Sequence, residues 1–166
     1  MFARCSVWAG LLAAVSLAAG CSRSVDVKQA LEVADATSGW YDAGIVNGKN
    51  KIVPSVTFRL KKKPDSDLSG VALNVVFRHP PPAGTNVEED WDEVFIQRAD
   101  FRDANETQPL TVRPEKGYTG DPPQSRTDIL QHSQFRDVRA RIFAKASSSQ
   151  WVEIGTVDVQ RQLIVH

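Results

Sequence analysis

The chain has 166 residues, of which 24% are charged and 42% are hydrophobic, with 20 basic and 20 acidic side chains. This length and composition are typical of one globular domain with its own hydrophobic core. The chain lacks the excess of basic residues by which proteins bind nucleic acids, so no nucleic-acid partner is expected.

Residues 1–20 have the three parts of a secretory signal peptide. Arg4 gives the start a positive charge, an apolar stretch rich in Ala, Leu and Val follows over 7–19, and small residues precede Cys21. The thirteen residues of the apolar stretch fall short of the roughly 18 that a membrane-spanning helix needs. We therefore predict that 1–20 is a cleaved signal peptide. An uncleaved membrane anchor or a buried helix is the alternative.

The segment Leu17-Ala18-Ala19-Gly20-Cys21 resembles the lipobox of bacterial lipoprotein precursors, with Ala18 where Leu is commoner. The resemblance implies cleavage between Gly20 and Cys21 and a diacylglyceryl group on the Cys21 thiol, and no other cofactor is expected. Two or three acyl chains together anchor a protein firmly to a membrane. In enterobacterial lipoproteins Asp after the cysteine favours the inner membrane, so Ser22 favours the periplasmic face of the outer membrane.

The first half of the mature chain predicts extended structure. Residues 21–30 are expected to be the lipidated N-terminus with a tether or an edge strand, although their apolar spacing also suits a helix. A strand is predicted near 30–46, and Asn47-Gly48 after it is a strong hairpin-turn signal. Two windows then alternate apolar and polar residues with the period of a half-buried strand; they are 56–61 and 71–78.

The second half continues the pattern less regularly. Strands are predicted near 93–98 and 109–113, although Trp91, Val94 and Phe95 are also spaced like a helix face. A helical turn at 127–133 is expected, capped by Thr127 or Asp128. A third alternating window covers 138–145. In the C-terminal stretch the apolar phase switches at Gly155, which indicates a bulge or sharp bend.

About seven short strands separated by turns predict an all-β fold over 31–166. The architecture expected is an antiparallel β-sandwich, immunoglobulin-like or transthyretin-like. The Cys…Trp…Cys pattern of antibody domains is missing. The chain has only Cys5 and Cys21, so the mature domain is expected to be stable without a disulfide.

The charged residues give no pattern typical of catalysis. The three histidines are scattered and match no metal-ligand spacing, so no metal site and no catalytic residue are predicted. The acidic run Glu88–Glu93 contains no turn glycine for a calcium loop, which favours a solvated acidic loop. His79 precedes a run of prolines and is expected in a loop. Lys61-Lys62-Lys63 is interpreted as a charged strand end rather than a lipid-binding patch.

Three aromatic residues are the candidates for a recognition surface. Trp40, Tyr41 and Tyr118 are predicted to bind a partner, because aromatic side chains on loops supply contact area. The alternative is that Trp40 and Trp151 are core residues and that Tyr118 packs a corner of the sandwich.

These features together predict a membrane-anchored, non-catalytic lipoprotein of the periplasm that binds an envelope protein or supports envelope assembly. Addition of a partner strand to a sheet edge is a natural mode of binding for such a fold. One alternative is a carbohydrate-binding module that uses the aromatic candidates. Another is a cell-wall-acting enzyme that uses two carboxylates of the acidic run.

Overall fold

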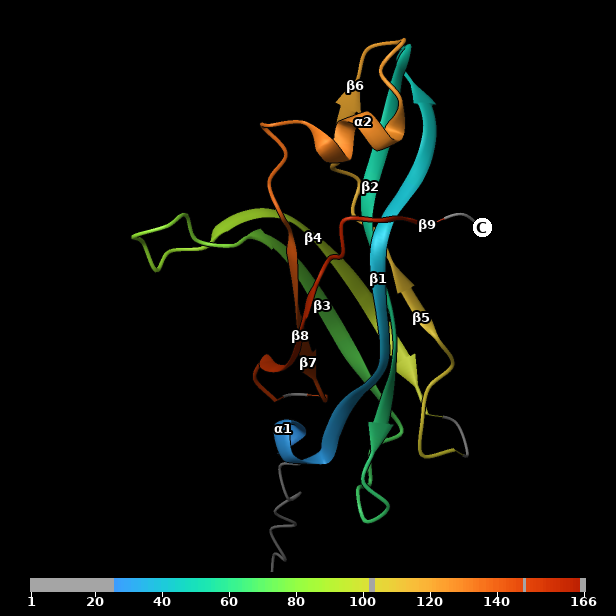
Figure 1. Cartoon of the computed structure of the whole chain (residues 1–166). Coiled ribbons are helices and arrows are strands. Elements are labelled where there is room, and N and C mark those ends of the chain that lie inside the picture. The colour runs from blue at the N-terminus through green and yellow to red at the C-terminus, as the bar shows by residue number, and fades with distance from the viewer. Residues whose placement is uncertain (1–25, 102–103, 148, 165–166) are drawn as a thin grey trace, which may run out of the picture.

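The computed structural model describes residues 26–101, 104–147 and 149–164, and shows a mainly β protein in which two sheets pack together like a sandwich (Figure 1). The described part has nine strands, more than the seven or so expected, because β5, β6 and β9 are only two or three residues long. In chain order the elements are α1 (Val27–Ala30), β1 (Leu31–Val46), β2 (Lys49–Lys62), β3 (Gly70–His79), β4 (Glu89–Asp100), β5 (Leu110–Val112), β6 (Tyr118–Gly120), α2 (Arg126–Gln131), β7 (Arg139–Lys145), β8 (Val152–Asp158) and β9 (Leu163–Ile164).

The first sheet is built on the long β1–β2 hairpin, which runs along the length of the molecule (Figure 1). Its turn is the predicted Asn47-Gly48, where both residues have positive φ angles of 53° and 76°. That conformation matches the right-handed twist of the flanking strands. β5 and β6 pair with successive parts of the other edge of β2, and β9 pairs with β1 in parallel.

The second sheet has the strand order β4-β3-β7-β8, and all its neighbours are antiparallel. The alternation predicted for β3 and β7 is confirmed, because every second side chain of both strands is buried between the sheets. The buried residues form one hydrophobic cluster that includes side chains of both sheets, both helices and the connections. The two sheets therefore share a single core.

Two alternatives that the sequence left open are decided, and one expectation is corrected. Residues 27–30 form a helical turn rather than an edge strand, because the Asp26 carboxylate accepts hydrogen bonds from the first backbone amides and Val27 and Ala30 are buried. The region 91–95 belongs to a strand and not to a helix, because it pairs with β3. The cap of α2 is Ser125, whose side chain accepts from the amide of Asp128 in a reciprocal capping box.

The bulge predicted at Gly155 is confirmed. The register of β7 and β8 shifts between Ile142 and Phe143, whose partners are Gly155 and Glu153. A Cβ atom at Gly155 would lie 2.7 Å from Cγ2 of Val33, so glycine allows β1 to approach β8 closely at this point. The close approach brings the two sheets together along one side of the sandwich.

Candidate functional site

Trp40 is the centre of an aromatic cluster where the two sheets meet. Its ring centroid lies 4.8 Å from that of Phe135, 5.6 Å from Tyr118 and 6.1 Å from Trp91. Trp40 comes from β1 and Trp91 from β4, so the cluster joins the sheets. Trp40 is 0% exposed, which confirms the alternative that it is a core residue. Its ring is therefore not available for direct contact with a partner.

The other two aromatic candidates are half-buried. The Tyr118 hydroxyl accepts a hydrogen bond from the amide of Arg136 at 3.1 Å, which ties β6 to the segment before β7. Tyr41 follows Trp40 in β1. The guanidinium of Arg113 stacks over the Tyr41 ring, with its Cζ atom 3.8 Å from the ring centroid. The structure therefore separates Tyr41 from the aromatic cluster that contains Trp40 and Tyr118. The three predicted residues do not form one exposed surface.

The acidic run at 88–93 is not a free loop. Residues from Glu89 onward form β4. The Glu89 carboxylate pairs with Arg136, in the segment before β7, and the Asp90 carboxylate pairs with Arg78 of β3. Glu88 has a side-chain exposure of only 17% and lies within 3.5 Å of the guanidinium nitrogens of Arg78, Arg139 and Arg141. Sequence spacing could not reveal these partners, because the two β7 arginines are about fifty residues away along the chain.

Ion pairing lowers the pKa of carboxyl groups on this face. The hydrogen bond from Arg136 is the main cause of the lowered pKa of Glu89. The hydrogen bond from Arg141 is the main cause of the lowered pKa of Glu153, and burial opposes it. A general acid needs the opposite shift, toward neutral pH. These two groups are therefore suited to permanent ion pairs.

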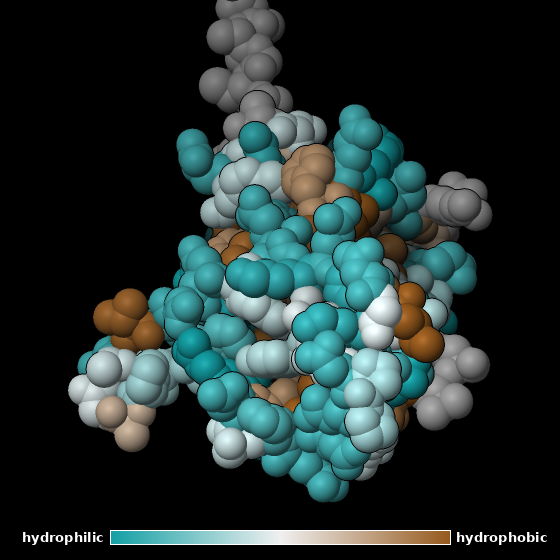
Figure 2. All heavy atoms as spheres, turned by 90° about the horizontal axis from the view of Figure 1, so that it is seen from above, coloured by the Kyte–Doolittle hydropathy of each residue, from teal (hydrophilic) through white to brown (hydrophobic). Residues whose placement is uncertain are grey.

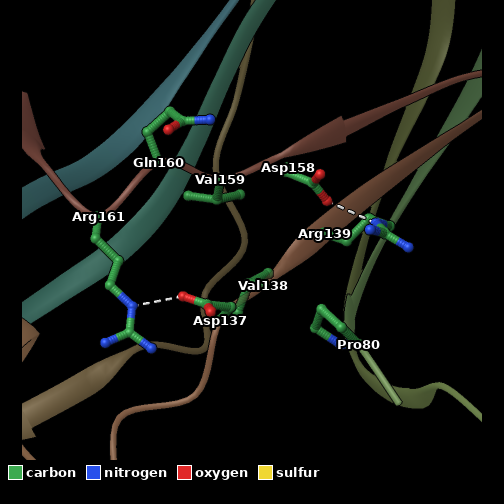
Figure 3. Close-up of a pocket in the computed structure, with 8 residues that line it drawn as sticks. All are labelled: Pro80, Asp137, Val138, Arg139, Asp158, Val159, Gln160 and Arg161. Atoms are coloured by element: carbon green, nitrogen blue, oxygen red, sulfur yellow. Dashed lines mark hydrogen bonds and ion pairs between the residues drawn. The ribbon is translucent and has the colours of Figure 1, made fainter. Parts of the chain in front are cut away.

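A hollow of about 440 Å³ lies beside this network, where the start of β7 and the end of β8 meet the start of the 80–88 loop. Figure 3 shows the residues that line it. Two ion pairs line it. The Arg139 guanidinium donates to the Asp158 carboxylate at 2.6 Å, and the Arg161 guanidinium donates to the Asp137 carboxylate at 2.6 Å. The charged groups at this hollow satisfy one another, which leaves little unpaired charge to attract an ionic ligand.

A larger hollow, of about 790 Å³, lies along the outer edge of β4. One wall is formed by Asp92–Phe95, and the other by Lys51 of β2 with residues of the segment after β5. The Lys116 amide donates to the Asp92 carboxylate at 2.8 Å, which joins the two walls. Among the described strands β4 pairs only with β3, so its other edge faces this hollow.

Two exposed aromatic side chains were not predicted as surface residues. Phe95 on β4 is 60% exposed and Trp151 before β8 is 41% exposed. Their ring centroids are 5.9 Å apart, with the planes at 75°. The expectation that Trp151 is a core residue is therefore wrong, because the β7–β8 turn places it on the outer face of the sheet. The only sequence signal for this exposure was that Trp151 is adjacent to Val152, so in a strand with period-two alternation the two side chains point to opposite faces.

The remaining expectations concern His79, a metal site, and the cleavage and lipidation residues. His79 is the last residue of β3 and is buried, not in a loop, and its Nδ1 donates to the carbonyl of Asp137 at 2.9 Å. Within the described ranges no three His, Cys, Asp or Glu side chains are grouped as a metal site would require. Gly20 and Cys21, the predicted cleavage and lipidation residues, lie outside the described residues.

The chain matches no protein-family model, no curated protein and no solved structure with which it was compared. Neither of the two described helices has the length and hydropathy needed to cross a bilayer.

Proposed function

We propose that this protein is a lipid-anchored, non-catalytic module of the bacterial envelope that binds a protein partner along the free edge of β4. The N-terminal sequence supports the anchor, because the small residues before Cys21 resemble a lipobox. Ser22, which stands after the cysteine where Asp would favour the inner membrane, supports a location at the periplasmic face of the outer membrane. The observation that carries the binding proposal is the β4 edge beside the 790 Å³ hollow.

The central part of β4 has the geometry that strand addition needs. Its pairing with β3 shifts register near both ends, but Asp92–Ile96 pairs regularly with Leu73–Phe77. Bulges are one way in which proteins protect a sheet edge from a new strand. The regular stretch between them is the part that lines the hollow. A partner segment in extended conformation could therefore pair with backbone groups there while its side chains occupy the hollow.

The two alternative functions find less support in this geometry. A sugar-binding platform needs exposed aromatic faces, but Trp40 is buried and the exposed Phe95–Trp151 pair is arranged edge to face. A glycosidase needs one carboxyl group with a raised pKa. The acidic run instead has carboxylates paired with arginines, and the pKa of Glu89 is lowered.

The anchor is tested by metabolic labelling with a fatty-acid analogue. We expect the wild type to carry the label and Cys21→Ser to lose it, because that thiol is the proposed site of acylation. Equal labelling of the two proteins would refute lipidation at Cys21.

The binding edge is tested by photo-crosslinking in intact cells. A photoreactive residue at Glu93, which is exposed on β4, should give one reproducible crosslinked protein in the envelope. The matched control is Gln160, an exposed residue beyond β8 at the far side of the same sheet, which should not give that product. Absence of a reproducible product at Glu93, or the same product from both positions, would contradict the proposed edge.

A further inference from the structure

We propose that one end of the sandwich lies against the phospholipid headgroups of the membrane, with Trp151 and Phe95 inserted into the interface. This end, called the α1 pole, consists of α1, the β2–β3 loop at 63–69, and the described residues of the β7–β8 turn, 146–147 and 149–151. The inference depends on the proposed lipid anchor at Cys21. It adds that the folded domain itself contacts the bilayer.

The position of α1 brings this pole close to the anchor. The described chain begins at Asp26, the N-cap of α1, five residues after Cys21. Five residues of fully extended chain span at most about 17 Å. A lipid on Cys21 would thus keep α1 within that distance of the headgroups. Figure 1 shows α1, the β2–β3 loop and the β7–β8 turn at the same end of the molecule.

Contacts between its parts hold the α1 pole together. The amide of Lys63 donates to the carbonyl of Ala30 at 3.0 Å, which joins the β2–β3 loop to α1. α1 also packs against β8, where the charge of Lys28 acts on Glu153. Because α1 is fixed to the β2–β3 loop and to β8, an anchor attached just before it orients the whole domain. The pole is therefore presented to the membrane as one surface.

The side chains exposed beside this pole are those that favour a membrane interface. Trp151 is the last residue of the β7–β8 turn, and the Nζ atom of Lys145 lies 5.9 Å from its ring centroid. With Phe95 they line a hollow of about 350 Å³ on the outer face of the second sheet. Tryptophan is enriched at headgroup level, and lysine can bury its aliphatic stem there while its ammonium group stays in water.

The opposite end of the molecule is different. Seen from that end, the surface is mainly hydrophilic, with apolar atoms in small separate patches (Figure 2). The other large hydrophobic side chains exposed in the described ranges are aliphatic, and they lie on the β1–β2 hairpin and the 80–88 loop; they are Ile45, Val46 and Val87. The exposed aromatic side chains of the described ranges are thus confined to the Phe95–Trp151 pair among the large hydrophobic residues.

Charge at the α1 pole is mixed, which determines the kind of lipid surface it fits. Exposed lysines 28 and 63 stand among the acidic residues 26, 65 and 67. With no excess of positive charge, attraction to anionic lipids adds little. We therefore expect the contact to form on zwitterionic phosphatidylcholine and to persist at high salt.

The test uses the full-length lipidated protein in phosphatidylcholine vesicles, with and without lipid brominated near the glycerol end of the acyl chains. Bromine quenches tryptophan fluorescence only at short range. We expect part of the wild-type fluorescence to be quenched and this quenched part to be lost in Trp151→Phe. Co-sedimentation of the protein with the vesicles is measured in parallel, because it reports the anchor independently.

A second readout does not depend on tryptophan. The only mature cysteine is the acylated Cys21, so a new cysteine can be labelled selectively with an environment-sensitive fluorophore. The emission of a fluorophore attached at Ser147→Cys, in the β7–β8 turn, should shift to the blue when the protein binds vesicles. Val87→Cys is the matched exposed control. It lies in the 80–88 loop that connects β3 to β4, and the emission of a fluorophore there should not shift.

The outcomes separate the two proposals. Protein that co-sediments and is quenched through Trp151 supports the membrane contact. If it co-sediments but wild type and Trp151→Phe are quenched equally, or neither is quenched, the contact is refuted and the anchor stands. Protein without fatty-acid label that stays in the supernatant refutes both proposals.

Discussion

Trp40 and Tyr41 are neighbours in β1, yet their side chains have different environments. Successive residues of a strand point to opposite faces of its sheet, so Trp40 enters the core and Tyr41 meets Arg113 outside it. The sequence identified both rings as important but left open which one was buried. The pairing of β1 with β2, in which Trp40 lies opposite Pro54, determines that the Trp40 side chain is the one that faces the core.

Trp40→Ala should destabilise the domain strongly. It removes the ring that contacts Phe135, Tyr118 and Trp91, and large aromatic-to-alanine changes in a core cost about 3–5 kcal/mol. Urea unfolding at neutral pH measures this change. Trp40→Phe should cost clearly less, because its ring fills most of the space and the indole Nε1 has no hydrogen-bond partner among the described residues. A loss below about 1 kcal/mol for Trp40→Ala would contradict the core position.

Glu153 makes stability depend on acid pH. Its folded pKa is lowered from the ordinary value of 4.5, chiefly by the hydrogen bond from Arg141. The interaction therefore stabilises the fold above pH 4.5 and is lost as the pH falls through the lowered folded pKa. For a partly exposed pair the contribution is about 0.2–1 kcal/mol.

Glu153→Gln should lower the free energy of unfolding at pH 7, and the difference from wild type should shrink below pH 4.5. Urea titrations at several pH values measure both proteins. Glu32→Gln changes an exposed carboxylate on β1 and serves as the control. A difference between wild type and Glu153→Gln that stays constant down to strongly acid pH would count against the Arg141 pair.

At the scale of elements, long-range pairing explains the main disagreement with the sequence-based prediction. A run of five acidic residues around one tryptophan has the composition of a solvated loop, but most of it lies in β4. Arginines on β3 and from the β7 region supply opposite charges, with Arg78 bound to Asp90 at 2.6 Å and Arg136 to Glu89 at 2.6 Å. Neutralisation by these neighbours makes strand pairing of the acidic run favourable.

The contact between β1 and β8 depends on the absence of a side chain at Gly155. Gly155→Ala should destabilise the domain by about 1–3 kcal/mol, because the new Cβ would lie 2.7 Å from Val33 Cγ2 and 3.2 Å from its Cβ. Urea unfolding checks the value. In Val33→Ala the clashing methyl groups are absent, so adding Gly155→Ala to that variant should cost less than adding it to wild type. Additive losses would show that the two residues do not meet.

At the scale of the whole molecule, one hydrophobic cluster joins both sheets and both helices. Chains of this size with a single core usually unfold in one cooperative transition. Tryptophan fluorescence of Trp151→Phe, which removes the exposed ring outside the cluster, reports the aromatic cluster, and far-ultraviolet circular dichroism of the same variant reports the strands. We expect their urea transitions to coincide within error. A fluorescence transition at clearly lower urea than the dichroism transition would mean that the aromatic cluster unfolds independently.

The sequence by itself determined what depends on local pattern. The period-two alternation gave the buried faces of β3 and β7, Asn47-Gly48 gave the hairpin turn, and Gly155 gave the bulge. These features follow from backbone conformation and from which side chains avoid water, and both are properties of neighbouring residues. The predicted signal peptide and the resemblance to a lipobox also rest on the sequence alone.

Only the tertiary structure decided which distant groups meet. It buried Trp40, exposed Trp151, paired the acidic run with arginines, and left the edge of β4 beside a hollow. Each of these outcomes depends on how strands far apart in the chain align, because a shift of one residue would reverse the face of every side chain. Both proposed surfaces, for a protein partner and for the membrane, are consequences of that alignment.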